Sequence, residues 1–238
     1  MTRRLVSDAK RRHTGGAGAD SNGGPRGRSP NGAPSIDELW LETLQRLCSR
    51  LAHELKGALN GVSVNLEVVR SRAERPDSPA SAVRQYAESA AAQLGMVIVM
   101  TEALLALTRP VRVPVELPTL VRRFEAIVAP AARAEGRSLE IAEPIDGMGT
   151  TTSAPNAVRL VLGTMLLRAT QEAARVTCRT EEGEVRQLRL EAQDGERLTV
   201  DAAVAAAVAA IGIRILATGE GITIAFPAAD DERTQGRT

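Results

Sequence analysis

Apolar side chains recur every three or four residues from position 40 to position 69, a spacing that places them on one face of an α-helix. This face consists of Trp40, Leu44, Leu47, Leu51, Leu55, Leu59, Val62, Leu66 and Val69. Ahead of it, Ser35 and Glu38 have the spacing of a capping box, in which the serine hydroxyl accepts from the third helical amide and the glutamate reaches back. We expect a helix that begins after Ser35 and ends near Arg72.

A second near-heptad stripe follows the prolines at positions 76 and 79 and predicts another helix, from residue 80 to residue 108. Its members are Val83, Ala90, Leu94, Val97, Thr101, Leu104 and Thr108. Two antiparallel helices joined by a short loop form a hairpin with one open apolar face, and a second copy usually completes such a hairpin. We therefore expect a homodimeric four-helix bundle.

Beyond Pro110 and Pro114, which end the second helix and form a linker, the pattern changes to shorter elements. Helices are expected at 117–134, 155–174 and 201–210, and strands at 138–142, 185–192, 197–200, 211–216 and 221–226. This order predicts an α+β fold in which helices lie on one face of a mixed sheet. The expected organisation is a disordered basic tail at 1–34, the hairpin domain at 35–109, a small α/β sandwich at 110–228 and a disordered tail at 229–238.

Composition narrows the classes of function. Hydrophobic residues make up 43% of the chain and aromatic residues only 2%, so aliphatic cores are expected. Cys48 and Cys178 are too few for a disulfide framework or a metal site, which fits a reducing cytoplasm. No apolar run approaches the roughly 20 residues that cross a membrane, and the net charge of +1 argues against nucleic acid as a partner of the folded part. For the basic tail, contact with nucleic acid or anionic lipid is the alternative to simple solvation.

His53 is the main candidate for chemistry. At roughly 100° per residue it points about 200° away from both Leu51 and Leu55, so it is expected to face solvent opposite the apolar face. Glu54 follows it directly. An imidazole beside a carboxylate is a competent nucleophile, because one nitrogen attacks while the carboxylate takes or orients the proton on the other. The remaining alternative is an ordinary surface histidine.

The segment 52–60, Ala-His-Glu-Leu-Lys-Gly-Ala-Leu-Asn, resembles the phosphoacceptor box of two-component sensor histidine kinases. The order of hairpin, proline linker and α/β sandwich is also similar to the catalytic core of that family, from about residue 36 to residue 228. The resemblance implies that His53 carries a phosphoryl group and that Glu54 acts as the base. It also implies that the second region corresponds to the family's ATP-binding domain.

Around the histidine, Lys56, Gly57 and Asn60 are expected to support the site and to dock the partner. Lys56 would neutralise charge on the transferring group. Gly57 stands where the family has the Asn or Thr that orients water for phosphatase action, and Ala58 replaces the family's proline. Glycine weakens a helix by about 1 kcal/mol relative to alanine. For Gly57 and Gly61, the alternatives are close helix packing, a local bend, or room for a docking partner.

The expected ATP site departs from the family pattern. Thr164 and Arg168 stand where the family has two asparagines, one of which binds magnesium. Asp194 begins the nearest candidate for the adenine-binding Asp-x-Gly-x-Gly element, but the rest of that element is missing. No glycine-rich lid precedes the last helix, and Asp201 would repel the anion that a helix N-terminus attracts. We expect no cofactor and no metal; the alternative is Arg168 as a fixed cation in place of magnesium.

These observations leave three functions open. The first is a dimeric histidine phosphotransferase of a two-component phosphorelay, which exchanges a phosphoryl group between His53 and the aspartate of a receiver domain in a response regulator or a hybrid histidine kinase. Dimeric phosphotransferases with a degenerate kinase-like domain have a similar plan. The second is a divergent histidine kinase that uses ATP and magnesium. The third is a non-catalytic pseudokinase scaffold that binds a kinase or a response regulator.

Overall fold

The computed structural model describes residues 33–75, 79–143, 145–181, 186–193, 195–219 and 221–227. The order of elements is α1 (Ile36–Ala73), α2 (Ala80–Thr108), β1 (Val115–Glu116), α3 (Leu117–Ala134), β2 (Ser138–Ile141), the short 3-10 helix η1 (Asp146–Met148), β3 (Thr150–Thr151), α4 (Pro155–Glu172), β4 (Arg175–Glu181), β5 (Arg186–Ala192), α5 (Ala202–Ala209), β6 (Arg214–Thr218) and β7 (Gly221–Phe226). The tails predicted at 1–34 and 229–238 lie outside the described residues, except for residues 33 and 34.

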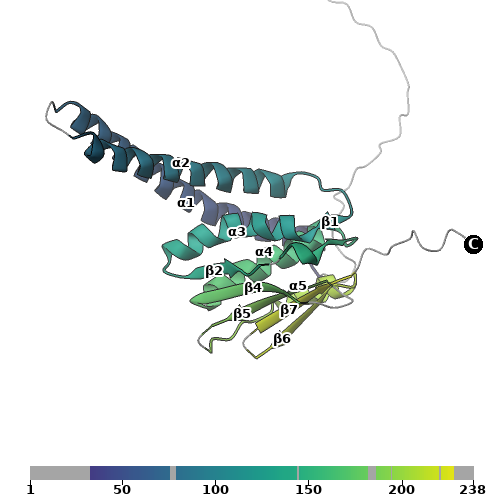
Figure 1. Cartoon of the computed structure of the whole chain (residues 1–238). Coiled ribbons are helices and arrows are strands. Elements are labelled where there is room, and N and C mark those ends of the chain that lie inside the picture. The colour runs from purple at the N-terminus through teal and green to yellow at the C-terminus, as the bar shows by residue number, and fades with distance from the viewer. Residues whose placement is uncertain are drawn as a thin grey trace, which may run out of the picture.

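The helices α1 and α2 form the predicted antiparallel hairpin, which projects from the α/β part of the chain (Figure 1). α1 has 38 residues, so it is about 57 Å long. The capping box at its start is present, because the Glu38 amide donates to the Ser35 hydroxyl at 3.2 Å and the Ser35 amide donates to the Glu38 carboxylate at 2.8 Å. The helix therefore begins where the sequence predicts.

The α/β part contains a five-stranded sheet in the order β2-β4-β5-β7-β6. β2 and β4 are parallel, and the other neighbouring strands are antiparallel. The helices α3 and α4 lie between this sheet and the hairpin (Figure 1). The predicted α+β fold, with helices on one face of a mixed sheet, is confirmed. The small pair β1 and β3 adds a two-stranded sheet that holds the linker after α2.

The first half of α1, residues 36–51, packs on the helices of the α/β part, and we call it the base. Trp40, Leu47 and Leu51 are buried in the same hydrophobic core as α3 and α4. The Trp40 ring meets the Phe124 ring edge to face, with 6.3 Å between the centroids. On α4, a Cβ placed at Gly163 would lie 2.9 Å from Phe124. The core thus continues from the sheet through α3 and α4 into the hairpin.

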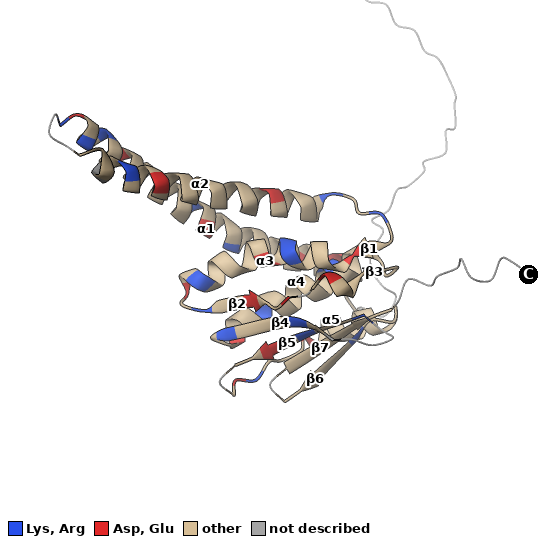
Figure 2. Cartoon of the chain, viewed as in Figure 1, with Lys and Arg blue, Asp and Glu red and all other residues tan. Residues whose placement is uncertain are grey.

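The second half of α1, residues 52–73, leaves the α/β part together with the first half of α2, and we call it the stalk. Several of its large apolar residues stay exposed in the single chain: Leu59 is 47% and Leu66 52% exposed, and on α2 Leu94 is 46% and Ile98 50% exposed. Most of α2 carries no charge (Figure 2). This is the surface on which a second copy was expected to pack, and dimerisation stays a prediction.

Helix α2 is an exception to the prediction that no apolar run is long enough to cross a membrane. Within the described chain, the segment Val83–Thr108 is long and apolar enough by composition to pass that test. Its few charges, at Arg84, Glu88 and Glu102, hid the length of the apolar stretch. In this structure the helix packs against α1 and α3.

One predicted strand is absent, and one strand of the five-stranded sheet was not predicted. Residues 197–200 form no strand, because the Thr199 amide donates to the Glu172 carboxylate at 2.7 Å instead of to a neighbouring strand. The strand β4, in contrast, was not predicted. Its short sequence is rich in charge, but Val176 and Cys178 alternate with polar residues and are buried on the face that the helices cover.

Candidate functional site

His53 lies at the start of the stalk, two residues after the buried Leu51, and its side chain is exposed as predicted. Residues three and four positions away on a helix share its face. On this face lie Arg50 in the preceding turn and Lys56 and Gly57 in the following turn. Asn60 follows one turn later and is also exposed. The surroundings of the imidazole on its own helix are therefore open, and Lys56 supplies an exposed positive charge there, whereas Arg50 is paired with Glu135 of the α/β part.

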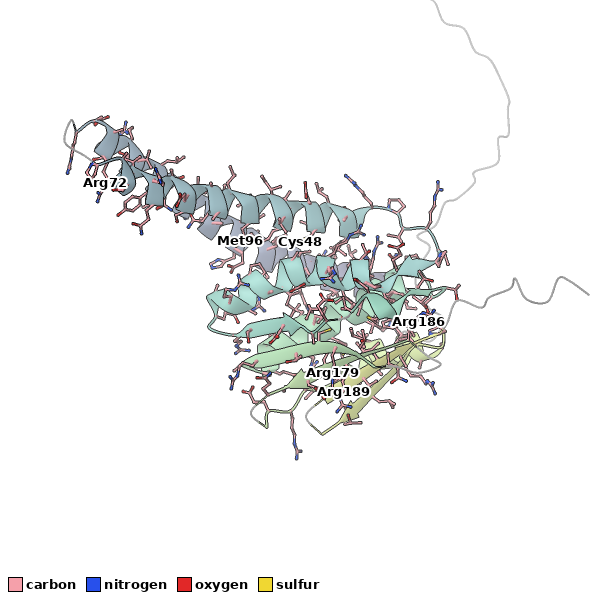
Figure 3. All side chains as sticks on the ribbon, viewed as in Figure 1. Cys48, Arg72, Met96, Arg179, Arg186 and Arg189 are labelled. Atoms are coloured by element: carbon pink, nitrogen blue, oxygen red, sulfur yellow. The ribbon has the colours of Figure 1, made fainter. Side chains whose placement is uncertain are left out.

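Glu54 has a different environment from His53. It is half-buried and lines a pocket of about 330 Å³ between the hairpin and the end of α3, with Met96 of α2 and Arg133 of α3. Figure 3 shows Met96 where the hairpin passes the α/β part. Among the described residues, neither His53 nor Glu54 has a hydrogen bond or an ion pair. Because consecutive helical side chains diverge by about 100°, Glu54 stands beside the imidazole and leaves its solvent side free.

The two glycines of this segment differ. A Cβ at Gly57 would have nothing within 4 Å, whereas a Cβ at Gly61 would clash with the amide end of the Gln93 side chain of α2. The Gln93 carbonyl oxygen in turn accepts a hydrogen bond from Asn65 at 3.2 Å. Of the alternatives open in the sequence, close helix packing therefore describes Gly61. Gly57 leaves open space between the His53 face and the Glu54 pocket, which it also lines.

The residue at the expected magnesium position, Thr164, is engaged inside the chain. It is 7% exposed, and its hydroxyl shares a buried hydrogen bond of 3.0 Å with the hydroxyl of Thr43 on α1. The neighbouring Gly163 brings α4 close to the same threonine, because a Cβ there would lie 3.2 Å from the Thr43 methyl group. This side of α4 is therefore a packing surface for the base of α1.

Arg168 and Asp201 are also held by internal contacts. The Arg168 guanidinium donates to the Glu172 carboxylate and to the Thr199 hydroxyl, both at 2.7 Å, and lies 3.8 Å from the Asp201 carboxylate. Burial would raise the pKa of Glu172, but hydrogen bonds from Thr199 and Arg168 outweigh it and lower that pKa. Asp201 caps α5 by accepting from two backbone amides. The end of α5 is thus already occupied by a carboxylate.

A pocket of about 380 Å³ lies next to these residues, between α1 and α4. It is lined by Thr43, Arg46, Ser49, Arg50, Thr164, Leu167, Arg168, Gln171 and Asp201. Its arginines are paired with carboxylates: Arg46 with Glu42 and Arg50 with Glu135, both at 2.5 Å, and Arg168 as described above. Asp194, the candidate for the adenine contact, lies outside the described residues.

The described residues contain no group of three or more His, Cys, Asp and Glu side chains that would hold a metal ion. Both cysteines are free thiols. Burial, followed by the charge of Glu125, raises the pKa of the Cys178 thiol to about 12, so this thiol stays protonated. Cys48 is half-buried in the base of α1. The absence of a cofactor and of a metal stays a prediction.

Two contacts of the candidate site had no signal in the sequence. Arg133 reaches the Glu54 pocket from α3, and Thr43 reaches Thr164 from α1. Both contacts join helices that are far apart in the chain. Periodicity assigns a residue to a face of its helix but does not name the helix on which that face packs.

No protein-family model matches the sequence, and no curated protein matches it. Solved structures with a similar arrangement include the Acinetobacter baumannii histidine kinase AdeS, at 12% identity over 75% of this chain and 98% of that chain, with a TM-score of 0.38. The cytoplasmic segment of the histidine kinase QseC matches at 10% identity over 58% and 94%, with a TM-score of 0.39. The Erythrobacter litoralis blue-light activated histidine kinase EL346 matches at 14% identity over 71% and 64%, with a TM-score of 0.36.

These three neighbours are histidine kinases, the family that the sequence resembles. At such low identities and TM-scores, the likeness carries no argument about function. The chemistry of this chain must therefore be inferred from its own residues.

Proposed function

We propose that the chain is a histidine phosphotransferase of a two-component phosphorelay, in which His53 accepts a phosphoryl group from one receiver-domain aspartate and passes it to another. The observation that supports this most is a contrast within the chain. His53 is exposed beside the open space at Gly57, whereas Thr164, Arg168 and Asp201 are tied up in internal contacts.

The transfer balances without a metal on this chain. A nitrogen of His53 attacks the phosphorus of an aspartyl phosphate, so the N–P bond forms as the bond to the aspartate oxygen breaks. The leaving group is the free aspartate carboxylate. The proton on the other ring nitrogen passes to water or to Glu54, and Lys56 offsets negative charge on the moving group. The return reaction on a second receiver reverses each of these steps.

The proposed assembly is a homodimer joined through the exposed apolar residues of the stalk. A receiver domain would dock on the open face around His53, where Lys56 supplies positive charge and Asn60 a polar contact. The phosphoryl donor is a response regulator or a hybrid histidine kinase. The proposed place of action is the cytoplasm.

The test is phosphoryl transfer from a labelled receiver domain to the purified chain. Wild-type protein should acquire label that is stable to base and labile to acid, and His53→Ala should acquire none. Glu54→Gln should slow labelling without abolishing it, because it removes a base but leaves the nucleophile. Absence of label on the wild type, or full label on His53→Ala, would refute the proposal. A chain that binds receivers without being labelled would be the scaffold.

One observation favours the histidine kinase as a second candidate. The pocket between α1 and α4 has a volume of about 380 Å³ and is lined by Thr164, Arg168 and Asp201, the positions that correspond to the family's ATP site. Incubation with labelled ATP and magnesium separates the two functions. The phosphotransferase predicts no label on His53 under these conditions, and label that Arg168→Ala removes would establish the kinase.

A further inference from the structure

A different pocket, also of about 380 Å³, lies where the linker after α2 crosses the first turns of α3 and α4. Prolines 110 and 114 and Leu120 form much of its apolar wall. Arg109 from the linker, Arg123 from α3 and Arg159 from α4 also line it. The pocket thus combines an apolar surface with three arginine residues.

Arg159 is the unusual member of this group. It is 5% exposed and donates to the Asn156 side chain at 3.1 Å and to the Arg109 carbonyl oxygen at 2.5 Å, but its Nε has no partner. Buried charges are normally paired with an opposite charge. In the described part of the chain, no carboxylate lies within ion-pair distance of Arg159. Burial first, and then the positive charge of Arg123, lower its pKa.

The rest of the pocket does not supply the missing negative charge. Neither Arg109 nor Arg123 forms an ion pair with a described residue. Glu116 is the lining residue that carries a carboxylate, and it accepts a hydrogen bond from Thr119 at 3.2 Å. The N-termini of α3 and α4 begin beside the pocket and add partial positive charge. In the pocket beside Thr164, by contrast, every lining arginine has a carboxylate partner.

We propose that this second pocket binds a small phosphorylated metabolite. Its phosphate lies against Arg159, Arg123 and Arg109, because a dianion matches an excess of two positive charges and guanidinium groups bind phosphate through paired hydrogen bonds. Its organic part lies against Pro110 and Pro114, and the volume falls within the range of small-molecule sites. The ligand is retained and transfers no group, so this site is independent of His53.

The experiment is an isothermal titration calorimetry measurement, in which the full chain is titrated with inorganic phosphate and, separately, with phenyl phosphate at constant ionic strength. Arg123 is half-buried and is the residue to change, since Arg159 is in the core. Both probes should bind, phenyl phosphate more tightly, and Arg123→Gln should weaken each by about tenfold or more, the effect of losing one charged hydrogen bond. Arg112→Gln, an exposed linker arginine that does not line the pocket, should bind like the wild type.

Other outcomes overturn the proposal. No saturable binding of either probe would exclude an anion site, and equal binding to Arg123→Gln would place the anion elsewhere. Loss of binding in His53→Ala would show that the phosphate had bound at the phosphotransfer site. Equal affinity for the two probes would exclude the contact between the organic part and the prolines. Because His53→Ala should bind normally, failure of this proposal is distinguishable from failure of the phosphotransferase.

Discussion

The base and the stalk of α1 carry the same apolar repeat in opposite environments. In the base, Leu47 and Leu51 are each 1% exposed, whereas in the stalk Leu59 is 47% and Leu66 52% exposed. The spacing is unchanged from one half to the other. An apolar repeat therefore determines which side chains share a face, while the neighbouring elements determine whether that face is buried. His53 lies where the environment changes.

Substitutions in the stalk should change the assembly of the protein most strongly. Replacing Leu59 and Leu66 together by Glu should convert a dimer into a monomer, because two carboxylates would enter each side of an apolar interface. The mass in solution, measured by light scattering, gives the result. Val64→Glu is the matched control, since Val64 is 64% exposed and lies on another face of the same helix. If the wild-type protein has the mass of a single chain in solution, the stalk does not form a dimer and the prediction is wrong.

The next largest effect is a difference between the base and the stalk in how the loss of unfolding free energy depends on protein concentration. Leu47→Ala should lower the free energy of unfolding by about 2–5 kcal/mol, because it opens a cavity in the core of the single chain. This loss should stay the same over a hundredfold range of protein concentration. For Leu66→Ala the loss should grow with concentration, since dimerisation stabilises the folded state by mass action. Urea unfolding at several protein concentrations measures the loss of stability of each variant. If the two losses depend on protein concentration in the same way, the base and the stalk do not differ in this respect.

A smaller effect is expected from the open glycines. Gly57→Ala and Gly95→Ala should each stabilise the hairpin by about 1 kcal/mol, because both positions are helical and neither new Cβ would meet a neighbour. Of the two substituted positions, only Gly57 lies next to His53 on α1, whereas Gly95 lies on α2. We expect Gly57→Ala to slow transfer from a receiver and Gly95→Ala to leave it unchanged. Equal transfer rates would show that the space at Gly57 is not used.

The smallest effect concerns the contact that holds the base on α4. Thr43→Val should destabilise the chain by about 1 kcal/mol, because it leaves the buried Thr164 hydroxyl without its partner. Thr43→Val combined with Thr164→Val should be nearly neutral, since no polar group is then left unpaired. The double-mutant cycle in urea unfolding tests this. Additive losses would mean that the two hydroxyls do not depend on each other.

Local signals in the sequence were enough to predict the bounds of the first three helices. The capping box placed the start of α1 at Ile36, and prolines and apolar spacing gave the bounds of α2 and α3. Exposure of His53 also followed from the helical period. These features depend on residues within a turn or two of each other, which is why they could be predicted.

Contacts between distant segments could not be predicted in the same way. Nothing near Thr43 indicates that it meets Thr164, and the strand expected at 197–200 was lost to a bond between Thr199 and Glu172. The excess charge around Arg159 depends on three elements that meet only in the folded chain. In each case the side chain can be read from the sequence, but its partner is known only from the folded structure.

The continuity of α1 through the boundary at His53 has a mechanical consequence. A tilt of about 10° at the base would displace the far end of the stalk, roughly 30 Å away, by about 5 Å, since the helix rises 1.5 Å per residue. His53 is two residues from the buried Leu51 and would hardly be displaced by the same tilt. A rotation of the base about the helix axis, however, would turn the imidazole through almost the full angle. A rotation at the base would therefore change the direction in which the His53 side chain points, with little change in the position of the residue.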